Sequence, residues 1–362
     1  MSARWLFLVL FIASAILGSA SASATLLFAG GEDIDFICTN MCKVDTGSGR
    51  FRANWAREGY YAQPGTSDPP SSYFSTPTFA GSSTIWVHAQ YWNSGGSTTT
   101  PGSQMIRVLD THGTTLIVHG TGTAGTVKIS SRNTTTGAIT DLPATCDAVM
   151  PDTNLDQIDL YINYSASGQV TLYKNSVSIC NYSGNVTNGD GATTLIQVQF
   201  GAAQNSTNND WSEVIVATTD TRAMARFTAN TAGDGNTTGF SGTSICSAIW
   251  NVTMSNPANY GYSGSTYILH ECTINSSIPA GAYGVVGLVM STQALVGSTG
   301  PQSFDFVTRT NNTDYLSGNI APTTSFSNIT NYIQTLNPAT SNPWAVSDFQ
   351  ATGFNVGEKT KP

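Results

Sequence analysis

Short runs in which apolar and polar residues alternate recur along this chain, and they limit its fold more than any other feature. In residues 156–182, Ile158 and Leu160 alternate with polar neighbours, and two further runs follow turns at 165–168 and 174–176. A period of two residues is typical of a β-strand, and no window of useful length has the 3.6-residue period of a helix. Three strands joined by such short turns predict an antiparallel meander.

The same pattern covers most of the chain. Gly, Asn and Pro separate the runs, and short strands at this spacing predict β-sandwiches. We expect two irregular regions, the proline-bearing segment 46–82 and the polar, Gly-rich segment 233–242. Outside the meander we expect strands at 26–28, 34–36, 84–93, 104–109, 115–119, 126–131, 138–142, 195–200, 211–217, 247–254, 265–274, 283–290 and 303–309.

Composition supports an all-β fold and excludes one class of partner. Only 10% of the residues are charged, against roughly 25% in an ordinary soluble domain. Helical surfaces need Glu, Lys, Arg and Ala, whereas Thr, Val, Ile and Tyr favour strands. The net charge is −8 and the basic cluster Arg50, Arg52 and Arg57 is short. Nucleic-acid binding requires a basic face that displaces counterions from phosphates, so we do not expect it.

The first residues form a leader of their own. Arg4 precedes an apolar run from Trp5 to Leu17, and Ala20-Ser21-Ala22 fits the small-residue rule for signal-peptide cleavage. Residues 1–22 are therefore predicted to be a signal peptide, or else a spurious leader translated from an upstream start codon. The run is too short for a stable membrane span. Two domains are expected after it, at 23–220 and 221–362, because 362 residues exceed one compact core.

Six cysteines fit export without forming a disulfide-dense scaffold. Cys246 and Cys272 lie on neighbouring predicted strands and are placed to pair. Cys38 and Cys42 lack the second pair of ligands that a zinc site needs. Isolated buried thiols are an equally good interpretation of most of the six.

The meander resembles the core of concanavalin A-like, or laminin G-like, domains, which carry a Gly-x-Val-x-Leu-Tyr-x-Asn-Gly hairpin. Here it runs from Gly168 to Ser176, with Ser in place of the last Gly. The resemblance implies a concanavalin A-like jelly-roll sandwich, followed here by a second, smaller β-sandwich domain.

Further segments resemble a family of tailed-phage and prophage virion proteins that normally begins near Leu26. Such proteins are taken to be structural or receptor-facing parts of the particle. The segments that carry this resemblance are 26–36, 211–217 with Asp220-Thr221-Arg222, 300–305, 337–340 and 351–357.

Catalytic motifs of related folds are missing from the sequence. Sandwich glucanases place their acids on one strand as Glu-x-Asp-x-x-Glu, and no such run exists here. Asp156 and Asp159 differ by three residues and should face opposite ways. No Gly-x-Ser-x-Gly nucleophile turn is present either. We therefore expect that the chain is not an enzyme, and a glucanase-type hydrolase is the least favoured interpretation.

Two kinds of ligand site remain as expectations. Trp86, Trp92 and Asn93 are the best glycan-binding candidates, because aromatic faces and amides suit sugars. The plainer interpretation is that both tryptophans fill a core, since their strand carries bulk on both faces. No resident cofactor is expected, although calcium is left open, with oxygen ligands among Asp110, Asp147, Asp152, Asn154 and Asp156.

These expectations converge on a non-catalytic virion protein, structural or host-recognising, that displays a lectin-like sandwich. An exported bacterial lectin-like glycan-binding protein is the alternative. The expected partners are other virion subunits or cell-surface glycans, and we expect a homo-oligomer. The expected location is the virion or the extracellular space.

Overall fold

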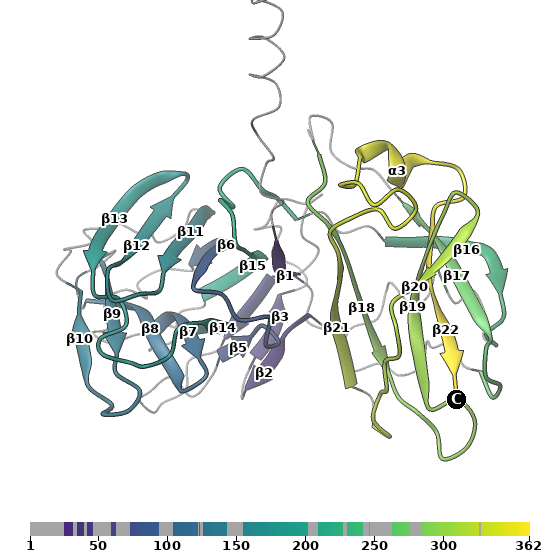
Figure 1. Cartoon of the computed structure of the whole chain (residues 1–362), viewed down its shortest axis with the longest axis horizontal. Coiled ribbons are helices and arrows are strands. Elements are labelled where there is room, and N and C mark those ends of the chain that lie inside the picture. Colours follow the sequence, from purple (N-terminus) through teal and green to yellow (C-terminus); the bar gives the residue numbers. More distant parts are fainter. Residues whose placement is uncertain are drawn as a thin grey trace, which may run out of the picture.

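A computed structural model describes most of the chain after residue 24. The described residues are 25–31, 35–39, 42–45, 59–62, 73–93, 104–121, 123, 126–142, 155–201, 209–226, 230–241, 246, 263–275, 284–325 and 327–362. They are nearly all β, as predicted: a sandwich of two antiparallel sheets is followed by a second, smaller β-sandwich (Figure 1). The leader, residues 1–22, lies outside the described residues.

The first sandwich consists of an eight-stranded and a seven-stranded sheet. The eight-stranded sheet has the order β13-β12-β11-β6-β15-β4-β3, with β1 also paired to β15, and the seven-stranded sheet has the order β10-β9-β8-β7-β14-β5-β2. The strand bounds are β1 Leu26–Gly30, β2 Ile37–Thr39, β3 Cys42–Asp45, β4 Gly59–Ala62, β5 Tyr73–Ser75, β6 Thr84–Asn93, β7 Gln104–Asp110, β8 Gly113–Gly120, β9 Val127–Arg132, β10 Ile139–Asp141, β11 Asp156–Asn163, β12 Gly168–Lys174, β13 Val177–Gly184, β14 Leu195–Gly201 and β15 Asn209–Ala217.

One apolar core joins these two sheets. Leu160 and Val170 from the eight-stranded sheet and Val108, Val118 and Phe200 from the seven-stranded sheet belong to the same buried cluster. Alternation along each strand supplies these inward side chains, as a sandwich requires. The predicted meander is confirmed, because β11, β12 and β13 pair antiparallel in sequence order.

The second sandwich is smaller. A five-stranded sheet, β16-β17-β22-β19-β20, faces a two-stranded sheet of β18 and β21, and Met290, Phe304 and Phe306 form the core between them. Trp344 and Phe349 belong to a further cluster around a short helix. The bounds are β16 Asn230–Thr238, β17 Leu269–Asn275, β18 Leu288–Ala294, β19 Ser303–Thr310, β20 Thr313–Leu316, β21 Ser327–Gln334, α3 Val346–Gln350 and β22 Asn355–Lys361.

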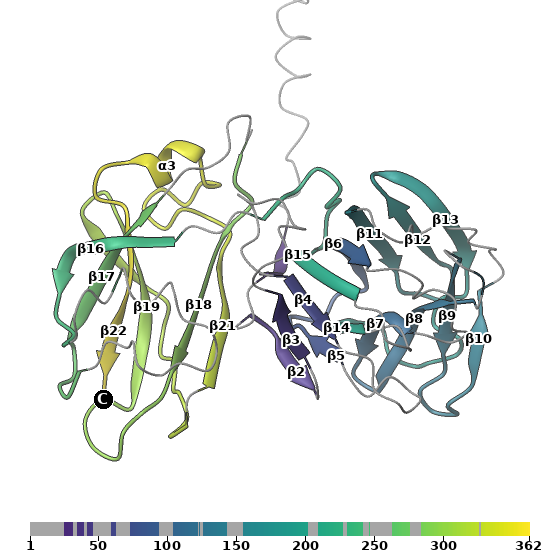
Figure 2. The same ribbon diagram turned by 180° about the vertical axis from the view of Figure 1, so that it is seen from behind.

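The two sandwiches lie side by side (Figures 1 and 2), and β1 contacts β21, as Figure 1 shows. Gly287, just before β18, lies close to Leu26, because a Cβ built there would be 3.3 Å from Leu26 Cδ2. The chain passes from the first sandwich to the second between Ala217, where β15 ends, and Asn230, where β16 begins. The domain limits at 220 and 221 stay predictions. Within the described residues, no helix is long and apolar enough to cross a membrane.

Both regions expected to be irregular contain strands. Segment 46–82 holds β4 and β5, and its prolines lie outside them. Segment 233–242 begins inside β16, whose backbone passes so near β17 that a Cβ on Gly235 would meet the Glu271 carbonyl carbon at 2.9 Å. Glycines that signal a loop therefore permit close strand approach here. The strand expected at 247–254 lies wholly outside the described residues. The strand expected at 34–36 is displaced, because β2 spans Ile37–Thr39.

Cysteine pairing agrees with the sequence where it is described. Cys246 and Cys272 form the expected disulfide, 26 residues apart. Cys38 and Cys180 are also disulfide-bonded, so reading them as isolated thiols is wrong.

Candidate functional site

Strand β6 presents two different faces. Ile85, Val87, Ala89 and Tyr91 point into the first core. Trp86, His88, Gln90 and Trp92 alternate with them and therefore point away from that core. Both tryptophans are half-buried and neither belongs to the core cluster. The interpretation of Trp86 and Trp92 as core residues is wrong.

The outward side chains of β6 continue across the sheet. Trp86 pairs with Tyr161 of β11, and His88 pairs with Asp159, which pairs in turn with Tyr173 of β12. Cross-strand partners share a face, so these side chains form one surface. We call it the outer face, and it comprises Trp86, His88, Gln90, Trp92, Gln157, Asp159, Tyr161, Asn163, Gln169, Thr171 and Tyr173.

Three aromatic rings gather at one end of the outer face. The Trp86 ring centroid lies 4.8 Å from that of Tyr161 and 5.6 Å from that of Tyr173, and the second pair is stacked at 22°. The Arg222 guanidinium carbon lies 4.5 Å from the Tyr173 centroid and 5.4 Å from the Trp86 centroid. We call Trp86, Tyr161 and Tyr173 the aromatic triad. Its rings are half-buried and lie outside the core.

Arg222 is held in place by Asp220. Its Nε donates to both carboxylate oxygens at 3.0 Å, and its Nη2 also donates to Oδ2. Hydrogen bonds from Arg222 hold the pKa of Asp220 below its usual range, and those to Asp220 raise the pKa of Arg222. The side chains of Arg222 and Asp220 are 34% and 44% exposed. The triad is therefore bordered by an accessible, mutually neutralised acid–base pair.

Beside the triad lies a buried polar group centred on Asp159. His88 Nδ1 lies 2.9 Å from Asp159 Oδ1, the same oxygen accepts from the Thr221 hydroxyl at 2.8 Å, and Gln157 Nε2 donates to Oδ2 at 2.7 Å. His88, Asp159 and Thr221 are almost fully buried. His88 Nε2 is buried and has no hydrogen-bond partner among the described residues.

Residues 218–226, which we call the connector, cover this group. Besides the Thr221 bond, the Arg222 carbonyl accepts from Gln157 Nε2 at 2.9 Å. At its far end Arg226 Nη2 donates to Asp35 Oδ2 at 3.2 Å. The connector therefore lies across the outer face, burying His88 and Asp159 while carrying Arg222 onto the aromatic triad.

The structure groups the expected glycan-binding residues differently from the sequence. Trp86 and Trp92 share a face but are six residues apart on one strand, or about 20 Å. Asn93 ends β6 opposite Asn209, and its side chain lies outside the described residues. The partners of Trp86 are Tyr161 and Tyr173, whose outward positions in the meander were readable from alternation. Nothing in the local sequence indicated that Arg222 would join them.

The described calcium candidates already have partners within the protein. Asp110 Oδ1 accepts from the backbone N–H groups of His112 and Gly113, and Oδ2 accepts from the Tyr164 hydroxyl. Asp156 accepts from Asn175 and lies 3.5 Å from Lys174 Nζ, on the face opposite Asp159, as predicted. The oxygens of Asp110 are thus occupied by donors. Asp147, Asp152 and Asn154 lie outside the described residues.

The Asp110 loop is tied to a second carboxylate. Asp190 Oδ1 lies 2.7 Å from His112 Nδ1 and accepts from the Ala192 N–H, while Oδ2 accepts from Thr134. The carboxylates of Asp110 and Asp190 and the His112 ring lie close enough together to hold a cation. Because these carboxylate oxygens already accept hydrogen bonds from protein groups, we interpret the group instead as a hydrogen-bond network that joins three loops.

No family model and no curated protein sequence matches the chain. Similar solved structures include the cellulose-induced protein Cip1, at 16% identity and a TM-score of 0.37 over 53% of this chain and 90% of that one. Endo-β-1,4-glucuronan lyase from the fungus Trichoderma reesei is 11% identical, with a TM-score of 0.41 over 55% and 95%. Domain 4 of the arabinanase AbnA from Geobacillus stearothermophilus, solved with arabinotriose, is 12% identical, with a TM-score of 0.37 over 57% and 95%. These likenesses concern architecture alone.

Proposed function

We propose that the chain binds a glycan on the outer face of its first sandwich, at the aromatic triad and the Asp220–Arg222 pair. The observation that carries this proposal is the position of Trp86 and Tyr173, stacked outside the core and only half-buried. Large aromatic side chains gathered on an outward sheet face are typical of interaction sites. Sugar rings offer C–H faces that pack on such rings.

The polar groups around the triad suit hydroxyls better than a net charge. Asp220 and Arg222 neutralise each other, so a strongly acidic or basic ligand finds no excess charge there. A carboxylate and a guanidinium side by side accept from and donate to neighbouring sugar hydroxyls. Gln169, Thr171 and Asn181 extend the polar surface along β12 and β13 through mutual hydrogen bonds. We therefore propose a neutral glycan.

We also propose that this role is binding rather than catalysis. Asp159 is the carboxylate of the outer face, and both its oxygens already accept hydrogen bonds from His88, Thr221 and Gln157. The more exposed Asp220 beside the triad accepts from Arg222 with both oxygens. A general base needs an accessible lone pair within reach of a substrate proton. The connector buries Asp159, which supports a recognition role.

As the setting, we propose a tailed-phage or prophage particle, with the sandwich displayed towards the host. An exported bacterial lectin is the alternative. Support comes from the resemblance of residues 26–36 and 211–217 to virion proteins. Adjacent capsid, portal or tail genes would favour the particle. A mature protein beginning after Ala22, seen by mass spectrometry, together with the absence of such genes, would favour the exported lectin.

The binding site is tested with purified full-length chain on an array of neutral and acidic glycans. We expect a neutral glycan to bind, and Trp86→Ala and Tyr173→Ala each to weaken binding about fivefold or more, since packing against an aromatic ring is typically worth about 1 kcal/mol. Tyr315→Ala, which removes a half-buried tyrosine from β20, is the matched control. Trp92→Ala tests whether the far end of β6 takes part in binding independently of the triad. Binding that survives both triad changes would reject this site, and hydrolysis of a glycan would reject the non-catalytic role.

A further inference from the structure

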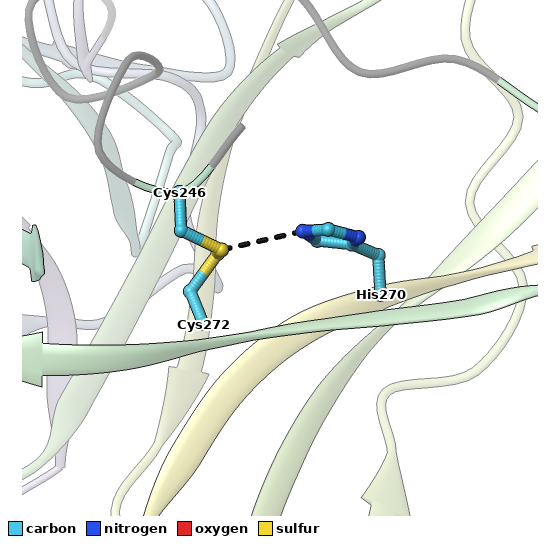
Figure 3. A group of neighbouring side chains, drawn as sticks. All are labelled: Cys246, His270 and Cys272. Carbon is cyan, nitrogen blue, oxygen red and sulfur yellow. Dashed lines mark hydrogen bonds between the residues drawn. A yellow bond between two sulfur atoms is a disulfide. The ribbon is translucent and has the colours of Figure 1, made fainter. Parts of the chain in front are cut away.

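The second sandwich contains three metal-ligating side chains that the proposed function does not use. His270 and Cys272 are two residues apart on β17 and therefore face the same side. Cys246 meets them from a separate segment, and Figure 3 shows its sulfur beside the His270 ring. The ligand atoms of the three residues all lie within 4.8 Å of one another, and all three residues are buried.

The histidine is already placed at nearly the distance that a metal requires. In a tetrahedral zinc site, sulfur and nitrogen ligands are about 3.6 Å apart, from Zn–S of about 2.3 Å and Zn–N of about 2.05 Å. Cys246 Sγ and His270 Nε2 are 3.3 Å apart. The two sulfurs are bonded and would have to separate to about 3.8 Å. Breaking the disulfide and moving the two sulfurs apart would therefore be needed to turn the present geometry into a three-ligand site.

Asp234 is available as a fourth ligand. Asp234 of β16 pairs with Cys272, and its Oδ1 lies 4.0 Å from His270 Nε2. Its side chain is 54% exposed, so it can move inwards or leave the fourth position to water. His270 Nδ1 is buried without a hydrogen-bond partner among the described residues. Zinc-bound histidines normally have that second bond, and its loss typically weakens metal binding 10- to 100-fold.

We propose that Cys246, Cys272 and His270 form a redox-gated site for zinc, closed as a disulfide and opened by a two-electron reductant. A phosphine reductant takes the oxygen of water and becomes a phosphine oxide, while the disulfide gains two electrons and two protons. Zinc then replaces the two thiol protons, which are released, and binds the Nε2 lone pair of neutral His270. The site exchanges a disulfide for a metal-mediated cross-link between the same two points, Cys246 and Cys272 of β17.

Metal binding to the full-length chain tests this proposal. The protein is reduced with the phosphine, equilibrated with zinc, desalted without oxygen and assayed for metal. We expect one more zinc per chain than in the oxidised protein. Because other disulfides are also reduced, the informative comparison is His270→Gln, which keeps every cysteine and should lose that zinc. His119→Gln, in the first sandwich, is the matched control and should retain it.

Cobalt(II) provides a second readout. Reduced wild-type protein should give thiolate-to-cobalt charge transfer and tetrahedral d–d bands, and His270→Gln should weaken cobalt binding at least tenfold. Circular dichroism of each sample shows whether reduction unfolds the second sandwich, in which case zinc should restore the signal. Equal zinc content in the oxidised and reduced protein, equal content in His270→Gln and wild type, or unfolding that zinc does not reverse would each overturn the proposal.

Discussion

The Thr221 hydroxyl donates a 2.8 Å hydrogen bond to Asp159, 62 residues earlier in the chain, and both side chains are fully buried. This bond fastens the connector to the outer face of the first sandwich. It also gives Asp159 Oδ1 a second hydrogen-bond partner beside His88. The connector that ends the first sandwich thus completes a surface built on β6 and β11.

Thr221→Val should destabilise the first sandwich by about 1–3 kcal/mol, because the isosteric change leaves a buried carboxylate oxygen with one donor fewer. Urea unfolding followed by tryptophan fluorescence measures the effect. Trypsin should also cut faster after Arg222, since its segment is less firmly held. Thr136→Val removes an exposed threonine and should change stability by less than about 0.5 kcal/mol. Equal stability of the two variants would show that the connector is held by other contacts.

Asp190 should make the stability of the first sandwich depend on acid. Burial alone would raise its pKa, but hydrogen bonds from Thr134, the Ala192 N–H and His112 outweigh that effect and bring the pKa to about 2. A carboxylate with a depressed folded pKa stabilises above its unfolded pKa, here near 3.8, and that contribution is lost as pH falls towards about 2. Asp190→Asn should therefore cost about 2 kcal/mol at pH 5 and far less near pH 2.

His112 sets the upper end of the pH range over which its interaction with Asp190 stabilises the first sandwich. Its hydrogen bond to Asp190 raises the pKa of His112 above 6.5. The stabilisation by protonated His112 is complete below the pKa of His112 in the unfolded chain. It is lost as the pH rises through the pKa of His112 in the folded protein. A double-mutant cycle of His112→Ala and Asp190→Asn should give stronger coupling at pH 5 than at pH 9. Coupling that does not change with pH would show that the imidazole acts as a neutral donor.

Much of the first sandwich was predictable because burial enforces alternation there. Strands β11 and β12 of the meander have a continuous apolar face, so their period of two is unambiguous. Strand β16 lacks that signal, since Gly, Thr and Asn occupy both of its faces. Its pairing depends on close approach to β17 rather than on buried apolar side chains. Polar edge strands of this kind resemble loops in a single sequence.

The candidate site was predictable only in part, for a similar reason. Both faces of β6 carry large side chains, so alternation alone does not say which face is buried. The seven-stranded sheet decides the matter by covering Ile85 and Val87. The approach of Arg222 to Trp86 depends on the path of the connector, which is set by tertiary hydrogen bonds such as that from Thr221 to Asp159. No local pattern encodes such a path.

Gly357 should be irreplaceable in the second sandwich. It lies in β22 between β17 and β19, and a Cβ there would be 2.2 Å from the His270 carbonyl oxygen and 2.9 Å from Glu271 Cα. Backbone atoms cannot yield as a flexible side chain does, so Gly357→Ala should destabilise by about 1–3 kcal/mol or more. Gly264→Ala, where a Cβ meets nothing within 4 Å, is the control and should be close to neutral. Thermal unfolding measures both variants, and equal melting temperatures would show that β22 is not closely packed at Gly357.

The disulfide between Cys246 and Cys272 should be a main source of stability in the second sandwich, because its core is small. The link closes a loop of 26 residues, and a loop of that length removes about 3.5 kcal/mol of chain entropy from the unfolded state. Cys246→Ala with Cys272→Ala should lower the free energy of unfolding by about 2–4 kcal/mol, measured in denaturant without reductant. The transition of the first sandwich, reported by its tryptophans, should stay unchanged, because Cys38 and Cys180 keep their bonds. A loss below about 1 kcal/mol would contradict this prediction and would mean that residual structure in the unfolded chain or strain in the folded one offsets the entropy of cross-linking.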